Sequence, residues 1–269
     1  MKAYFSILRQ QMIGQMQYRA GFWAGMSTHI FWGVARAAIL VAFYLYGQGE
    51  ADITMRQAVS MVWLQQLAGV LVPGWNTNAD AALYNQLRTG DVAYELLRPL
   101  DAYTHWYVRS IAGRIGTFLL ELVPILGIGL LVPEPWGLGA PVSPLHALAC
   151  LITLLSGLFT SCAMILLSYA MLLDVRVGDA PSRMAVTVAQ ILSGLYLPLQ
   201  LWPEGMQTFL YYQPFAGMLD LPVRLYVGAQ PLARAGEIVL LQAFWTAVFV
   251  LAGRAWIGRS FKKLVIQGG

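Results

Sequence analysis

The stretch that decides the fold is HALACLITLLSGLFTSCAMILLSYAMLL, residues 146–173, which contains no Asp, Glu, Lys or Arg. An α-helix rises about 1.5 Å per residue, and the hydrocarbon core of a bilayer is about 30 Å thick. About 20 apolar residues are therefore enough to cross it. The stretch predicts a membrane-spanning helix.

The composition of the whole chain agrees with this prediction. Of its 269 residues, 58 % are hydrophobic and 11 % are charged, and the mean hydropathy is +0.60. A soluble domain carries roughly 25 % charged residues. The net charge of +4 is small and forms no basic stripe, so nucleic-acid binding is not expected. The class predicted is a polytopic, all-α membrane protein.

Further long apolar blocks lie on both sides of this stretch, and together they predict six spans. We place these spans at 22–46, 58–80, 106–132, 146–173, 184–202 and 236–257. Five of them fill residues 22–202, and the whole chain, 1–269, forms one membrane domain. The second span is interrupted by Gln65, Gln66, Pro73 and Asn76.

The segments outside the spans have three different patterns. Residues 1–20 alternate apolar and polar faces and predict an amphipathic helix on the membrane interface, or else an extension of the first span. Residues 203–235 are apolar, aromatic and broken by prolines, so we expect short re-entrant helices on the external side. Residues 258–269 form a basic cytoplasmic tail.

The distribution of Lys and Arg predicts the orientation. The N-terminal segment, the second-to-third loop, the fourth-to-fifth loop and the C-terminal tail hold most of these residues. The opposite side has only Arg56, Arg224 and Arg234. Both termini are therefore predicted to be cytoplasmic, and an even number of spans, which places them on the same side, agrees with this.

One dense polar patch, RTGDVAYELLRPLDAYTHWY, occupies residues 88–107 of this apolar chain. Asp91 after Gly90 suits a helix N-cap, and Pro99 stops the helix, which leaves about two turns between them. A helix this short needs contacts with other parts of the protein or with a partner. The patch is either an ordinary polar loop or a docking surface.

Two stretches resemble one known family. LRTGDVAYELLRPLDAYTHWY, residues 87–107, looks like the interior-loop signature of permease subunits of type-2 ABC exporters. GLYLPLQLWPEGMQTFLYYQPFAGMLDLPVRLYVG, residues 194–228, is similar to the external segment before the last span of the same family, with Trp202-Pro203 in place of Phe-Pro. Span number, orientation and length also fit this ABC transporter permease family.

The resemblance implies that the second-to-third loop is a coupling helix that inserts into a cytoplasmic ATPase subunit. The implied contact residues are Gly90, Asp91, Tyr94, Glu95, Leu97, Arg98 and Pro99. The fourth-to-fifth loop would add a smaller contact through Asp174, Arg176 and Asp179. The partners implied are the ATPase subunits and a second permease, either identical or a sister subunit. ATP and Mg²⁺ would be held by the ATPase.

No motif in the sequence predicts chemistry in this chain. A P-loop needs a Lys after Gly, and none of Lys2, Lys262 and Lys263 follows Gly. The three His residues lie far apart, and Cys150 and Cys162 have the spacing of neither a redox nor a zinc motif. We expect no catalytic residue, no cofactor and no metal site, and we expect both cysteines to be buried small apolar residues.

Two ionisable residues are predicted at membrane depth. Arg36 lies in the first span and Glu121 in the third, at similar distances from the inner boundary by helix rise. An unpaired charge there is costly, so we predict a buried Arg36–Glu121 ion pair, or else that each faces water or a partner subunit. Glu121 also keeps open an ion-coupled secondary transporter, and a non-transporting membrane scaffold is a further alternative.

Polar and small residues on the second and fifth spans are the candidates for a translocation path. The alternative is that they serve only helix packing and interhelical hydrogen bonds. They are Gln65, Gln66, Asn76, Gln190, Ser193 and Gly194. The expected activity is outward movement of an amphiphilic or hydrophobic solute, such as a lipid, a drug-like natural product or a peptide. The expected location is the cell membrane, which is the inner membrane in a bacterium.

Overall fold

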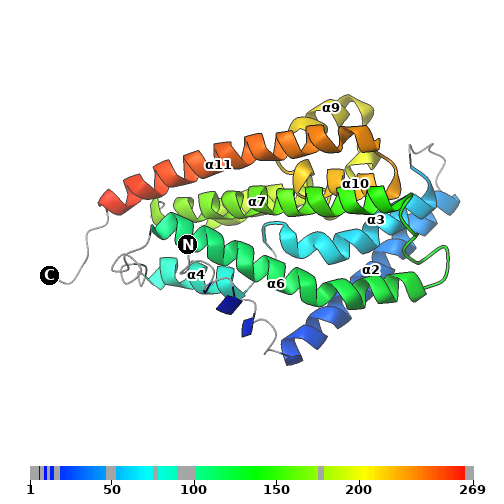
Figure 1. Ribbon diagram of the computed structural model, residues 1–269, viewed down its shortest axis with the longest axis horizontal. Coiled ribbons are helices and arrows are strands. Elements are labelled where there is room, and N and C mark those ends of the chain that lie inside the picture. The colour runs from blue at the N-terminus through cyan, green and yellow to red at the C-terminus, as the bar shows by residue number, and fades with distance from the viewer. Residues whose placement is uncertain are drawn as a thin grey trace.

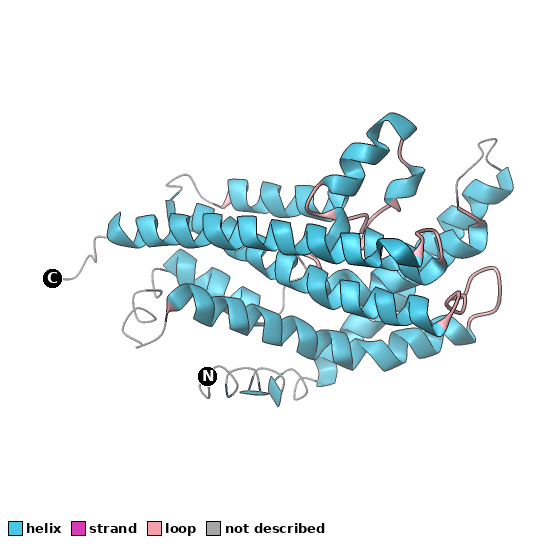
Figure 2. Cartoon of the chain, turned by 45° about the horizontal axis from the view of Figure 1, so that its top comes forward, coloured by secondary structure: helices cyan, strands magenta, loops and turns pink. Residues whose placement is uncertain are grey.

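The structure is a computed structural model of the whole chain. It describes residues 19–46, 53–74, 78–89, 101–174 and 179–263, together with residues 6, 9–10, 13–14 and 92. Most of the predicted interfacial helix 1–20 lies outside the described residues, as does the tail beyond residue 263. Within the described part every regular element is helical, which confirms the all-α class (Figure 2).

Four helices are long and apolar enough to cross a membrane, and they confirm four of the predicted spans. They are α2 (Arg19–Tyr46), α6 (Ala102–Leu131), α7 (Pro144–Asp174) and α11 (Ala235–Lys263). Figure 1 shows α6, α7 and α11 running along the length of the molecule, whereas α2 crosses them obliquely. We call the end where α6 begins and α11 ends the α4 end, and the opposite end the α9 end.

The other two predicted spans are broken, which corrects the expectation of six continuous crossings. Residues 58–80 form α3 (Met55–Ala68), the 3₁₀ turn η1 (Gly69–Leu71) and the beginning of α4 (Asn78–Thr89). Pro73 causes the first break, because the residue before a proline avoids the helical region, and Val72 is extended at ψ 148°.

The fifth predicted span, 184–202, breaks in a similar way. Its helix α8 (Ala180–Leu192) stops before Gly194, whose φ of +79° favours glycine. Only a short 3₁₀ turn, η2 (Leu199–Leu201), follows Pro198. The sequence marks the second span as interrupted at Pro73, whereas nothing in it indicates the break at Gly194.

Residues 203–235 form short helices, as predicted. These are α9 (Glu204–Tyr212), η3 (Ala216–Met218), α10 (Asp220–Val227) and η4 (Leu232–Arg234). Nearly all of α10 is buried, and its Asp220 and Arg224 form an ion pair at 2.5 Å. Gly228 ends α10 in the left-handed conformation.

Helix α7 is the central helix, since it packs against α11, α10, α8 and α6. Small side chains allow these close contacts: a Cβ on Gly157 would lie 2.7 Å from the carbonyl oxygen of Gly217. Thr160 on α7 shares a hydrogen bond of 2.8 Å with Thr246 on α11. Cys150 and Cys162 are free and buried, as predicted.

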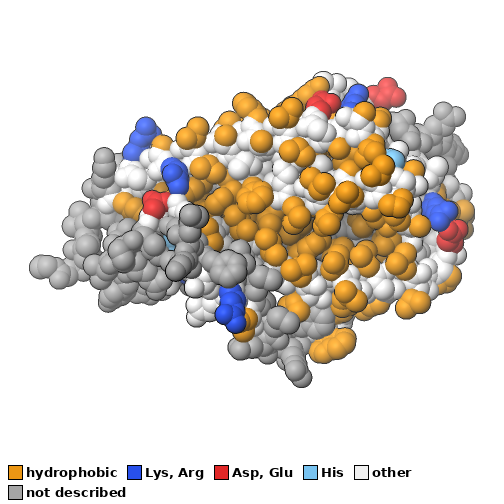
Figure 3. Space-filling model, viewed as in Figure 1, with side chains coloured by type: hydrophobic (Ala, Val, Ile, Leu, Met, Phe, Trp, Pro, Cys, Tyr) orange, Lys and Arg blue, Asp and Glu red, His pale blue; other side chains and the backbone are white. Residues whose placement is uncertain are grey.

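The outer surface is apolar between the two ends. Figure 3 shows hydrophobic side chains over the face formed by α6, α7 and α11, with charged side chains mainly near the ends. Leu131, Leu240 and Leu251 are examples that are more than half exposed. A face of this kind suits contact with lipid chains rather than with water.

Candidate functional site

The two helix breaks lie side by side in the interior. Gln65 Nε2 on α3 donates a hydrogen bond of 2.7 Å to the carbonyl oxygen of Gly194, at the break after α8. From the other side, Val186 and Gln190 of α8 pack against Gly74, so that a Cβ on Gly74 would lie 2.7 Å from Val186 Cγ1. Gly74 has φ +93°, which favours glycine.

Side chains from other helices satisfy the carbonyl groups that the breaks leave unpaired. Arg114 on α6 donates to the carbonyl oxygens of Val70 and Val72, the second at 2.9 Å. Arg36 on α2 donates to Leu195 O at 2.8 Å. Buried backbone polar groups need such partners because a bilayer core supplies no water.

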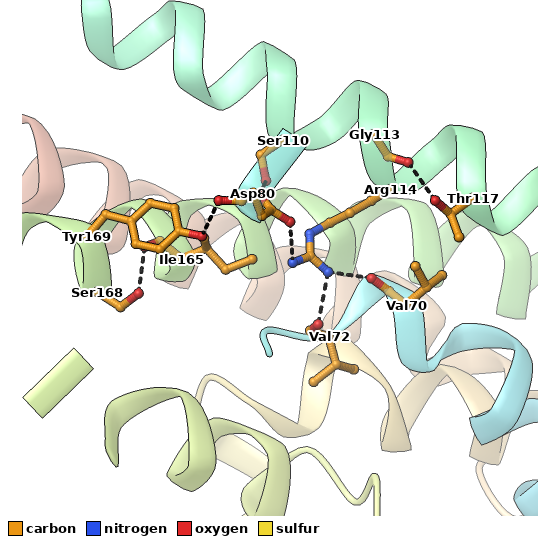
Figure 4. A network of polar contacts seen from close by, with 10 residues as sticks. All are labelled: Val70, Val72, Asp80, Ser110, Gly113, Arg114, Thr117, Ile165, Ser168 and Tyr169. Carbon is orange, nitrogen blue, oxygen red and sulfur yellow. Dashed lines mark hydrogen bonds and ion pairs between the residues drawn. The ribbon is translucent and has the colours of Figure 1, made fainter. Parts of the chain in front are cut away.

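Arg114 also belongs to a buried network that joins three helices (Figure 4). Its guanidinium forms an ion pair of 2.9 Å with Asp80 of α4, and both side chains are at most 2 % exposed. Ser110 of α6 donates to Asp80 Oδ1 at 2.8 Å, and Tyr169 of α7 donates to Asp80 O at 3.2 Å. The network therefore fixes α4 against α6 and α7.

A cavity of about 520 Å³ adjoins this network, between α4, α6, α7 and α8. Its lining combines polar, aromatic and aliphatic side chains with the glycine of the first break. The lining residues are Gly74, Ala81, Tyr84, Asn85, Arg114, Ile165, Ser168, Tyr169, Ser182, Arg183, Val186, Thr187 and Gln190.

The predicted path residues occupy different places around these features. Gln190 lines the cavity, while Gln65 and Gly194 lie at the breaks and Ser193 Oγ donates to Gln190 O at 2.9 Å. Gln66 lies elsewhere, with its Oε1 3.4 Å from His29 Nδ1. Asn76 is outside the described residues.

The structure does not bring Arg36 and Glu121 together. Arg36 reaches Leu195 O and lies over the rings of Trp32 and Tyr196, whereas Glu121 Oε2 is 3.5 Å from His29 Nε2. His29 precedes Arg36 by two helical turns, a difference of about 10 Å along α2. Because α2 runs obliquely, depth estimated from helix rise along each span does not show which residues of α2 and α6 are neighbours. The prediction of an Arg36–Glu121 pair is therefore corrected.

Most of the predicted ATPase contact lies outside the described residues. This applies to Gly90, Asp91, Tyr94, Glu95, Leu97, Arg98 and Pro99, and also to Arg176. Asp174 is the last residue of α7. Val92, within the same loop, is 1 % exposed and belongs to a buried cluster with Leu83, Tyr103 and Trp106.

Asp179, the remaining predicted contact residue, links α8 to α4 at the α4 end. It accepts hydrogen bonds from Tyr84 of α4 and, at 2.7 Å, from Arg183 Nε of α8. The hydrogen bond from Tyr84 is the main reason that the pKa of Asp179 lies below its usual range, and Arg183 adds to the effect. We call these three residues the α4–α8 clasp.

A second link joins α6 and α11 at the same end. Arg254 NH2 lies 3.5 Å from Asp101 Oδ2 and donates to Thr104 at 2.7 Å. Asp101 is the N-cap of α6, and its hydrogen bond from Thr104 is the main cause of its lowered pKa. In the described parts of the chain, no three His, Cys, Asp or Glu side chains are grouped closely enough to hold a metal.

Sequence reasoning missed the Asp80–Arg114 pair and the clasp. A signal existed for the pair, because Asp80 ends the second predicted span and Arg114 lies inside the third. A buried charge of either sign requires a partner. Nothing local in the sequence indicated that Tyr84 would reach Asp179.

Searches among curated proteins and among solved structures gave no match. A family model described as ABC-2 family transporter protein matches residues 31–268, which is most of the chain. The protein therefore belongs to the ABC-2 transporter family, whose members are membrane components of transport systems that associate with an ABC ATPase.

Proposed function

We propose that this chain is the permease subunit of an ATP-driven exporter and forms half of its translocation pathway. The observation that carries the proposal is the α4–α8 clasp. Helix α4 leads directly into the loop 90–99, and α8 leads to the break at Gly194. Movement of that loop by an ATPase would therefore pass through α4 to both broken segments.

Two further links favour this route. The buried Asp80–Arg114 pair holds α4 to α6, and Tyr169 holds it to α7. Because α4 is short and tied at several points, it would move as one body with its partners rather than bend alone. The same three helices surround the cavity, so a displacement of α4 would change its shape.

The solute is proposed to be amphiphilic or hydrophobic, with outward movement as its direction. The mixed lining of the cavity and the apolar outer face support this class over a small ion. A separate cytoplasmic ATPase would hold ATP and Mg²⁺. The other half of the pathway would be a second permease, either identical or a sister subunit.

The orientation proposed places the α4 end in the cytoplasm, with both termini on that side. Arg88, Arg183, Arg254 and Arg259 lie on elements that reach this end. An excess of Lys and Arg on one side is typical of the cytoplasmic side. The membrane would be the cell membrane, or the inner membrane in a bacterium.

Co-purification tests the assembly. The chain should bring down its ATPase and a second permease in fixed ratio from a mild detergent. Replacing Glu95 and Arg98 by Ala should lower ATP hydrolysis by the complex or weaken the complex. The matched control replaces Arg56 and Glu134, an exposed pair at 3.2 Å near the α9 end, and should change neither. Unchanged hydrolysis in the loop variant contradicts the proposal.

A second candidate, an ion-coupled secondary transporter, is favoured by the contact of Glu121 with His29 between α2 and α6. Ionisable residues within spanning segments often carry ions or protons. Proton-driven uptake by vesicles that contain this chain alone would favour this candidate. A third candidate, a membrane scaffold, would bind the ATPase without any transport.

A further inference from the structure

We infer that the cavity between α4, α6, α7 and α8 binds an anionic, acceptor-rich group, such as the phosphate or carboxylate head of an amphiphile. Among the described residues, the charged side chains of its lining are Arg114 and Arg183, and no described carboxylate lines it. Their partners, Asp80 and Asp179, are not among the lining residues. A ligand in the cavity therefore meets the positive side of both pairs.

Two of the lining residues, Arg114 and Gln190, carry side-chain donors without a partner among the described residues. Arg114 is 1 % exposed, and its Nε has no hydrogen-bond partner among the described residues. The side-chain oxygen of Gln190 accepts from Tyr196 at 3.1 Å, which leaves its amide nitrogen without a partner in the described part of the chain. A buried donor without a partner, such as Arg114 Nε, is costly, so a ligand with several acceptors would relieve this cost.

The remaining lining suits the apolar part of an amphiphile. Ala81, Ile165 and Val186 contribute aliphatic surface, and Tyr84 and Tyr169 add aromatic rings. The volume of about 520 Å³ is that of a small-molecule site, because such sites usually measure about 300–1,000 Å³.

The position of the cavity suggests where a ligand would enter. Tyr84 and Arg183 of the clasp stand on the side toward the α4 end, and Gly74 marks the inner end at the helix break. Only the identification of the ligand with the exported solute rests on the proposed function. Binding itself requires neither ATP nor the ATPase.

The test measures binding of radiolabelled dodecyl phosphate to the full chain purified in dodecyl maltoside. One saturable site is expected. Val186→Trp should fill the cavity and weaken binding by more than about tenfold. Val188→Trp is the matched control, because Val188 lies on the same helix, is 46 % exposed and does not line the cavity. It should bind as the unchanged chain does.

A second pair of variants tests the donor without filling the cavity. Gln190→Leu should weaken binding by roughly tenfold, the effect of one hydrogen bond to a charged group. Tyr196→Phe removes only the hydrogen bond between Tyr196 and Gln190 and should leave binding unchanged. Binding by Gln190→Leu and Val186→Trp that equals binding by the unchanged chain would overturn the inference.

Competition identifies the head group and its source. Dodecyl glucoside, a neutral amphiphile, should not displace the probe. If it displaces the probe as effectively as unlabelled dodecyl phosphate does, the inference is overturned. Displacement by inorganic phosphate alone at similar concentration would support an anion site and assign it to a free anion rather than a lipid. Loss of ATPase co-purification with binding retained would contradict the proposed function and leave the site standing.

Discussion

Replacing Asp80 by Asn removes the carboxylate that faces Arg114 in the buried network of Figure 4. Both side chains are at most 2 % exposed, so the variant leaves the Arg114 charge buried without its carboxylate partner. Removing one member of a buried ion pair typically costs about 3–5 kcal/mol, because the other charge remains buried and unpaired. We expect a loss of this size for Asp80→Asn.

The double variant Asp80→Asn/Arg114→Gln refines the prediction. With both charges removed, no unpaired ion remains, so the total loss should be less than the sum of the two single losses by about 0.5–3 kcal/mol. Arg114→Gln alone also weakens the contacts with the carbonyl oxygens of Val70 and Val72. Complete recovery in the double variant is therefore not expected.

The assay follows thermal unfolding through the reaction of Cys150 and Cys162 with a thiol-reactive dye. Both thiols are free and buried, so they react when the fold opens. A loss of 3–5 kcal/mol corresponds to a decrease in Tm of roughly 6–20 °C for a chain of this size.

The control replaces Arg56 by Gln, which breaks the exposed ion pair with Glu134 and should change stability by about 0–1 kcal/mol. If Asp80→Asn unfolds at the same temperature as this control, the buried network does not hold α4 in place.

Three further predictions follow from single contacts. Gly74→Ala should destabilise the chain by about 1–2 kcal/mol in the same assay, because φ +93° is unfavourable for an L-residue. Asp179, whose pKa is lowered in the folded chain, stabilises it at neutral pH and loses this effect as the pH falls through that pKa; Tyr84→Phe should return the pKa toward 3.8, measured by NMR titration. The exchange Arg36→Glu/Glu121→Arg should restore nothing lost by the single variants, because the two side chains have different partners.

Controls and contrary outcomes complete these predictions. Gly127→Ala in α6, where a Cβ meets nothing within 4 Å, should not destabilise the chain. A Gly74 variant as stable as the Gly127 variant contradicts the argument from φ. If the pKa of Asp179 is the same in the Tyr84→Phe variant, the hydrogen bond from Tyr84 does not lower that pKa, and this prediction is contradicted. If the Arg36→Glu/Glu121→Arg exchange recovers what the single variants lose, the two side chains form a direct ion pair after all, and our correction is wrong.

Long uncharged runs were the part of the fold that could be read from the sequence. Such a run has one stable form in lipid, so residues 146–173 predict α7 without any tertiary information. The broken crossings were harder. Gln65, Gln66, Pro73 and Asn76 marked the second span as interrupted, but a break is tolerable only where neighbouring side chains satisfy the backbone, and the sequence does not show these neighbours. Gln65 was a signal of such a break, because a buried amide requires a hydrogen-bond partner.

The candidate site was less predictable than the fold. Gln190 and Gly194 could be selected by residue type, but the partner of Gly194 is Gln65, 129 positions away in the sequence. Distance along the helix axis placed Arg36 opposite Glu121, and the oblique α2 changed this arrangement. Pairings of this kind depend on helix crossing angles, which the sequence pattern does not specify.

The most direct measurement uses a Thr187→Cys variant in the assembled complex with its ATPase. Thr187 is exposed and lines the cavity, and the two native cysteines are buried, so a water-soluble maleimide should report this position alone. Our account predicts that ATP changes the rate of labelling and that Glu95→Ala/Arg98→Ala abolishes the change. If the complex hydrolyses ATP but the rate of labelling does not change, the claim that movement of the loop 90–99 is transmitted to the cavity is contradicted.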